Sequence, residues 1–193
     1  MLTRRLFLAG LTAFPALAQA APTRYRLDPQ ASTVGFTYIL NGVAQRGTMP
    51  VSRADLLIDP DNLASAQVDV SVSVAQAWTA LFFATDALKG ASVLDAANHP
   101  EVRFVSTSIR LAQDGRLSGG ATVTGRVTVR GVTRPLTLQA DLFRLPGSAP
   151  DDLRALTIRL RGALSRSAFG ASGFPNLVAD TVTLDINAAI RAV

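Results

Sequence analysis

The stretch ATVTGRVTVRGVTRPLTLQA, residues 121–140, contains two runs in which apolar and polar side chains alternate. A period of two places the apolar side chains of each run on one face of a β-strand. Turn-forming residues from Gly131 to Pro135 separate the runs, and a parallel crossover would need a link of about a dozen residues or more. The stretch therefore predicts two neighbouring antiparallel strands. Pro135 has no N–H, so we expect it at the beginning of its strand or where no ladder hydrogen bond is required.

The same alternation recurs along most of the chain after Arg24. Regular or less regular alternating runs lie at residues 34–40, 47–58, 68–74, 101–111, 156–160 and 182–188. Turn residues between the runs mark short links, which favour antiparallel neighbours. About eight strands result, and eight strands can close a barrel that leaves room for side chains or one small ligand. We expect an all-β fold with one helix, arranged as an antiparallel eight-stranded barrel, with a sandwich as the alternative.

Residues 76–90 show a helical period instead. Side chains on one face of this segment recur three or four positions apart, at Trp78, Leu81, Phe82, Thr85 and Leu88. Such spacing indicates an amphipathic helix, and Gly90 is placed to end it. We expect the helix to cover the wall or mouth of the barrel with Trp78, Leu81, Phe82 and Leu88 turned inward.

Residues 1–20 are typical of a bacterial export signal. Two arginines at positions 4 and 5 precede an apolar run over residues 6–17 and the motif Ala18-Gln-Ala20. The run is too short to span a bilayer as a helix. The paired arginines resemble a twin-arginine signal, and an ordinary secretory signal is the alternative. We expect cleavage after Ala20, one mature domain over residues 21–193 and a periplasmic location.

The composition excludes several classes of function. The chain has no cysteine, one histidine (His99) and one lysine (Lys89), which removes disulfides, thiolate chemistry and most transition-metal sites. It has no nucleophile elbow and no glycine-rich phosphate loop, and His99 lies directly before Pro100, as a turn residue does. The net charge of +5 comes from dispersed arginines, without the basic block of a nucleic-acid binder. We therefore expect neither catalysis nor a metal or cofactor, and no nucleic-acid partner.

One group of arginines leaves two interpretations open. No acidic residue lies between its members, which are Arg154, Arg159, Arg161 and Arg166. They form either a solvated strand face or an anchor for an anionic lipid head group, since the guanidinium group matches phosphate geometry.

Four motifs together resemble the YceI-like family of bacterial secreted proteins, which are polyisoprenoid-binding, lipocalin-like barrels. The motifs are Tyr25-Arg-Leu-Asp28 with Ser32-Thr-Val-Gly-Phe36; Asp95 to His99-Pro100 with Phe104 and Ser106; Gly125 to Leu138; and Ser165-Arg-Ser-Ala-Phe169-Gly170 with Asp180-Thr-Val-Thr-Leu184. Their order and spacing cover the chain from Tyr25 to about Arg191. The sequence departs from the family at Ile39-Leu40-Asn41, where a histidine is often found, and in the unusually apolar Leu81-Phe82-Phe83.

The resemblance implies a periplasmic carrier whose lipocalin-like barrel holds the long tail of an isoprenoid lipid or quinone, without catalytic residues. It leaves room for transient contact with a membrane. From the strand faces and the helix we expect the ligand to be lined by Val34, Phe36, Tyr38, Trp78, Phe82, Phe83, Phe104, Val123, Val127 and Phe169. A filled barrel that acts as a structural or stress-related interaction module is one alternative. An enzyme acting on a lipid held in the barrel is another.

Overall fold

The computed structural model describes residues 22–112, 119–149 and 152–193. The predicted export signal over residues 1–20 lies outside these described residues. The described parts of the chain contain no helix that is both long enough and apolar enough to cross a membrane.

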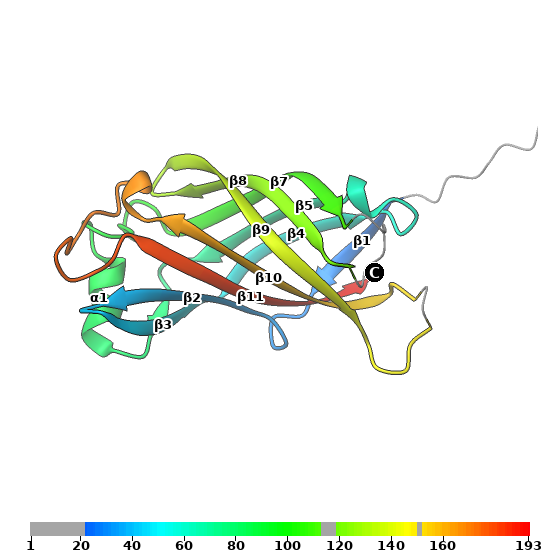
Figure 1. Ribbon diagram of the computed structural model, residues 1–193, viewed down its shortest axis with the longest axis horizontal. Coiled ribbons are helices and arrows are strands. Elements are labelled where there is room, and N and C mark those ends of the chain that lie inside the picture. The colour runs from blue at the N-terminus through cyan, green and yellow to red at the C-terminus, as the bar shows by residue number, and fades with distance from the viewer. Residues whose placement is uncertain (1–21, 113–118, 150–151) are drawn as a thin grey trace, which may run out of the picture.

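A closed antiparallel barrel forms the body of the molecule (Figure 1). Its wall runs through β1 (Thr23–Leu27), β4 (Val51–Ile58), β5 (Gln67–Ser73), β7 (Glu101–Leu111), β8 (Ala121–Val129), β9 (Val132–Arg144), β10 (Ala155–Ser165) and β11 (Thr181–Ala192). The barrel closes because β1 pairs with β4 on one side and with β11 on the other. Closure leaves no sheet edge along this wall.

Three further strands extend the wall toward one end: β2 (Thr33–Leu40), β3 (Val43–Met49) and β6 (Trp78–Thr79). Strands β1 and β2 pair with different parts of β11, and Pro50 is the only residue between β3 and β4. The strand segments therefore occupy eight positions around the barrel. This arrangement confirms the predicted eight-stranded barrel and excludes the sandwich.

Residues 121–140 lie in the β8–β9 hairpin. Arg130 and Gly131 both have positive φ angles, 51° and 73°, as the two-residue turn of a tight hairpin requires. Pro135 lies opposite Arg126 of β8, whereas the ladder between β9 and β10 begins only at Gln139. The predicted pairing of these two strands is confirmed.

The helix over residues 76–90 was predicted too long. The structure has strand β6 at Trp78–Thr79, paired with Gly47 and Thr48 of β3, and then a shorter helix, α1 (Phe82–Lys89). The Thr79 N–H donates to Oγ1 of Thr85 at 3.0 Å, which joins the strand to the helix. The apolar spacing predicted a helix at Trp78 and Thr79 because it reflects only local sequence. It does not reveal that β3 offers these two residues backbone partners. Gly90 does end the helix, and its N–H donates to the Asp86 carbonyl.

Two apolar clusters pack inside the barrel, and Ile158 of β10 contacts both. One, toward α1, includes Val74, Leu136 and Phe169, and the other includes Leu56 and Ile190. Two short 3-10 helices, η1 (Leu63–Ser65) and η3 (Ser167–Phe169), complete the described elements.

Candidate ligand-binding lumen

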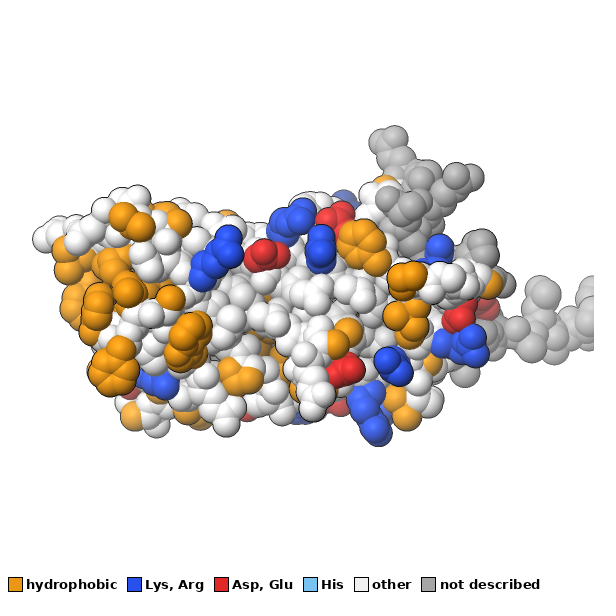
Figure 2. Space-filling model, turned by 90° about the horizontal axis from the view of Figure 1, so that it is seen from below, with side chains coloured by type: hydrophobic (Ala, Val, Ile, Leu, Met, Phe, Trp, Pro, Cys, Tyr) orange, Lys and Arg blue, Asp and Glu red, His pale blue; other side chains and the backbone are white. Residues whose placement is uncertain are grey.

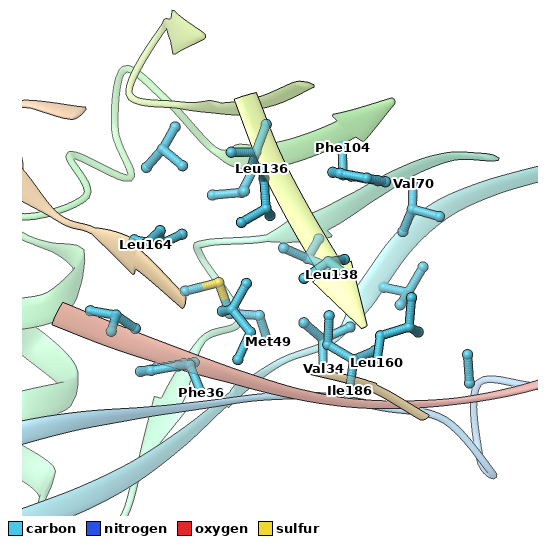
Figure 3. Close-up of a pocket in the computed structure, with 18 of the residues that line it drawn as sticks. Val34, Phe36, Met49, Val70, Phe104, Leu136, Leu138, Leu160, Leu164 and Ile186 are labelled. Carbon is cyan, nitrogen blue, oxygen red and sulfur yellow. The ribbon is translucent and has the colours of Figure 1, made fainter. Parts of the chain in front are cut away.

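A cavity of about 460 Å³ occupies the barrel interior and is lined almost entirely by apolar side chains (Figure 3). Alternate residues of two long strands follow it from one end to the other, at Leu156, Ile158, Leu160 and Leu164 of β10 and at Val182, Leu184, Ile186, Ala188 and Ile190 of β11. A volume of 300–1,000 Å³ is usual for a ligand pocket. We call this cavity the lumen.

Most of the residues predicted to line a ligand face the lumen. These are Val34, Phe36, Tyr38, Phe83, Phe104, Val123, Val127 and Phe169. Whether they contact a ligand stays a prediction.

Trp78 and Phe82 do not line the lumen, and their predicted inward orientation is wrong. Their exposed fractions are 59% and 84%. The reason is that the helix begins at Phe82 instead of at residue 76, so a different face of the helix points into the lumen. That face consists of Phe83, Ala84, Ala87 and Leu88.

Two phenylalanine rings lie over glycines of neighbouring strands. A β-carbon at Gly47 would overlap the ring of Phe36, and one at Gly125 would overlap the ring of Phe104. Phe36 and Gly47 are direct partners across β2 and β3, so both face the lumen. Each ring occupies the space that a side chain larger than glycine would fill on the neighbouring strand. The glycine thus lets the bulky aromatic ring lie close to the barrel wall.

The described lining includes few polar side chains and no carboxylate or imidazole. The polar residues are Ser32, Tyr38, Thr79, Arg166 and Asn187. The hydroxyl of Tyr38 is buried and has no hydrogen-bond partner among the described residues. The described chain also lacks any group of three acidic, histidine or cysteine side chains placed to hold a metal ion.

Arg166 has a role that the sequence did not reveal. Its guanidinium donates hydrogen bonds to the backbone carbonyls of Ala171, Gly173, Val178 and Ala179. The side chain is 9% exposed, and these bonds fix the loop over residues 171–179 against the barrel. The only cue in the sequence was its position inside the last family motif.

The other arginines of the predicted group behave as a solvated face. Arg154 pairs with Asp152, Arg161 pairs with Asp141, and Arg159 lies over the ring of Phe143 at 5.6 Å. The four do not converge on one point, so the structure gives no support to a shared head-group anchor.

The lumen reaches the surface at the end of the barrel that carries α1. Phe83, Phe174 and Leu177 are exposed and also line the lumen. The Asn41 N–H donates to the Leu177 carbonyl at 2.8 Å, so the β2–β3 turn holds this edge of the opening. We call the opening between these segments the mouth.

The sequence of this closed barrel with its apolar lumen matches a known protein family. The model of the YceI-like domain matches residues 25–190. The chain belongs to the YceI-like family. A UPF0312 protein of Pseudomonas putida is 26% identical to this YceI-like chain over 185 residues, which cover 91% of the chain and 90% of the relative. A UPF0312 protein of Vibrio parahaemolyticus is 26% identical over 144 residues, or 72% of the chain and 73% of the relative.

Solved structures share the fold of this YceI-like barrel. Burkholderia cenocepacia BcnA superposes with a TM-score of 0.73 at 22% identity, covering 85% of this chain and 99% of BcnA. A polyisoprenoid-binding domain from Saccharophagus degradans, implicated in plant cell wall breakdown, gives a TM-score of 0.64 at 12% identity and covers 89% and 99%. At these identities the similarity establishes the fold.

Several residues of the family motifs make hydrogen bonds that hold this YceI-like barrel together. The Tyr25 hydroxyl donates to the Leu153 carbonyl at 2.8 Å, and Oγ of Ser106 accepts the Val68 N–H at 2.9 Å. Asp180 accepts the Ser167 N–H at 2.9 Å, next to Arg166. The motifs therefore supply scaffold contacts as well as lumen-lining side chains such as Phe36, Phe104 and Phe169.

Proposed function

We propose that this protein binds the tail of an isoprenoid lipid, such as a polyprenyl chain or a quinone, in its lumen and carries it in the periplasm. The unfilled apolar lumen is the observation that supports the proposal. A long hydrocarbon chain without polar groups matches a lining that offers almost none. The polyisoprenoid-binding domain among the fold neighbours supports the same ligand class.

The energetics favour binding through the tail alone. An isoprene unit has five carbons, and burying it contributes roughly 3 kcal/mol at about 0.8 kcal/mol per CH₂. Four units give on the order of 12 kcal/mol, from which association and ordering remove several kcal/mol. Micromolar binding corresponds to about 8 kcal/mol. A specific head-group contact is therefore not required.

The lumen also weighs against the two alternatives. A structural module with a filled barrel needs a packed interior, and a cavity of about 460 Å³ is the opposite arrangement. Catalysis needs a positioned acid, base or nucleophile, and Tyr38 and Arg166 are the only titratable side chains in the described lining. The guanidinium of Arg166 is already bonded to backbone carbonyls.

Filling the lumen tests the proposal. Ala188 of β11 lines the lumen, whereas Ala189 does not and points to the opposite face of its strand. Ala188→Phe should abolish saturable binding of a prenyl alcohol or quinone by the lipid-stripped protein, and Ala189→Phe should leave it intact. Ligand should also raise the unfolding midpoint of the wild type and not that of Ala188→Phe. Absence of saturable prenyl binding by the wild type would refute the proposal.

The periplasmic location rests on residues 1–20 and is tested separately. Cells should release the protein with the mass of residues 21–193. Replacing both paired arginines with lysine should block export if the twin-arginine route is used. An intact chain retained in the cytoplasm would overturn this part of the proposal.

A further inference from the structure

Exposed apolar side chains gather around the mouth. Among the described residues, six of the nine large apolar side chains that are exposed belong to this end: Val43, Trp78, Phe82, Phe83, Phe174 and Leu177. We call these six the rim. Figure 2 shows hydrophobic side chains concentrated at the same end, which Figure 1 identifies by α1.

The rim is one continuous structure, although its residues come from distant parts of the sequence. The Gly173 N–H donates to the Ser92 carbonyl at 2.8 Å, which joins the 171–179 loop to the segment after α1. The Asn41 N–H joins the same loop to the β2–β3 turn, and β6 pairs with β3. These bonds link the segments of the rim around the mouth.

The fold itself makes little use of Trp78 and Phe82. Both side chains lie outside the lumen, and Phe82 occupies the outer face of α1, where a surface helix normally carries polar groups. Soluble monomers rarely expose large contiguous apolar patches, and such patches mark sites of interaction.

We propose that the rim docks onto the surface of a lipid bilayer. Tryptophan is enriched at membrane interfaces, and phenylalanine on a short helix inserts below the head groups. Two cations, Arg46 beside β6 and Lys89 at the end of α1, flank the aromatic side chains, against one acid, Asp86, on the helix. The two cations suit phosphate groups at the bilayer surface.

A protein partner fits the rim less well. Protein interfaces carry about ten direct hydrogen bonds, and the Trp78 indole N–H is the sole hydrogen-bonding group among the six rim side chains. The rim also surrounds an opening, so a second copy facing it would meet a narrow ring. A bilayer requires neither hydrogen bonds nor shape complementarity.

Docking would connect the lumen with the interior of the bilayer. Phe83, Phe174 and Leu177 belong both to the rim and to the lumen lining. An apolar chain could therefore pass from the bilayer into the lumen along apolar side chains, without crossing water. The docking step itself does not depend on which lipid the lumen holds.

The only tryptophan of the chain, Trp78, lies in the rim and reports docking directly. Because the described barrel begins at residue 22, the test uses lipid-stripped protein over residues 21–193. Phosphatidylcholine vesicles, with and without phosphatidylglycerol, should shift the Trp78 emission to shorter wavelength. Lipids with brominated acyl chains should quench it, and the protein should float with the vesicles.

Two matched variants locate the docking surface. Phe82→Ser should weaken vesicle binding by about tenfold or more, because it removes the most exposed aromatic side chain of the rim. Phe143→Ser removes an exposed phenylalanine that is outside the rim, and vesicle binding should not change. Both variants should unfold close to the wild-type urea concentration, since neither side chain lines the lumen and Phe143 loses only its exposed contact with Arg159.

Several results would overturn the docking proposal. One is unchanged Trp78 emission together with no flotation. Another is an equal loss of vesicle binding in both variants. A shift that follows protein concentration without vesicles would assign the rim to a second copy instead. If vesicle binding is absent while a short prenyl alcohol still binds, docking is wrong and the proposed function stands.

Discussion

The ring of Phe36 covers the α-carbon of Gly47, its partner across β2 and β3, and leaves no space for a β-carbon there. The ring of Phe104 in β7 likewise leaves no space for a β-carbon at Gly125 of β8, although the direct partner of Phe104 is Val127. In both places a small residue allows a large one to lie close to the wall. The open lumen therefore depends on glycine as well as on apolar side chains.

Gly47→Ala should destabilise the protein by about 1–3 kcal/mol, the usual range for overpacking. The new β-carbon would meet the Phe36 ring and lie 2.8 Å from the Trp78 carbonyl oxygen. In the Phe36→Ala background the same substitution should cost less, because only the backbone contact remains. Urea unfolding of the four proteins of this cycle measures the difference. Equal costs in both backgrounds would show that ring and glycine do not interact.

Tyr38→Phe should stabilise the ligand-free protein by about 1 kcal/mol, because it removes a buried hydroxyl without a partner. Tyr25→Phe is the matched control. Its hydroxyl donates to the Leu153 carbonyl at 2.8 Å, so the loss should destabilise by about 1 kcal/mol. The opposite signs of the two changes in unfolding midpoint are the expected result. A stability loss in both variants would mean that the Tyr38 hydroxyl is satisfied in solution.

Arg166→Lys should destabilise by about 2–4 kcal/mol, although the charge is kept. An ammonium group lacks the planar fork that reaches four carbonyls, so buried acceptors would lose their donors. Arg159→Lys is the control, because Arg159 is exposed and lies over Phe143. Hydrogen exchange should be faster at Ala179, whose N–H donates to Ile39, in the Arg166 variant only. Similar exchange in both variants would contradict the assigned role.

Stability should decrease as the pH falls below about 4. The Arg154 side chain lowers the pKa of Asp152 from 3.8 to about 2, and the Arg103 side chain lowers the pKa of Asp69. Hydrogen bonds from Ser165 and Ser167 lower the pKa of Asp180. A carboxyl group with a lower pKa in the folded state stabilises above its unfolded pKa, and this contribution is lost as pH falls through the folded value. Urea titrations from pH 6 to pH 2 should show a smaller acid loss for Asp152→Asn.

The barrel could be predicted because the strand and turn patterns that specify it lie in short, continuous stretches of the sequence. Alternation in residues 121–140, with a Gly-containing turn between the runs, specified two strands and their pairing, and the structure has that hairpin. The double role of β11, which pairs with both β1 and β2, could not be predicted. Such pairing depends on residues more than 140 positions apart, as between Thr37 and Thr183 or between Tyr25 and Ala192.

The site was predicted in part for a similar reason. Inward positions on strands follow from alternation, so Phe36 and Phe104 were assigned to the interior from the sequence. Trp78 and Phe82 were misassigned because a strand followed by a helix can mimic one longer helix. Arg166 was missed because a buried arginine bonded to carbonyls of its own loop has no characteristic spacing.

Both ends of the described barrel lie far from the mouth. The Val193 N–H donates to the Arg24 carbonyl at 3.0 Å, so the final residue adjoins the first strand (Figure 1). Either end can therefore carry a tag, a fluorophore or a link to a sensor chip without obstructing the entrance. A monolayer of the protein immobilised through residue 193 would present every barrel in one orientation, with its opening toward the solution.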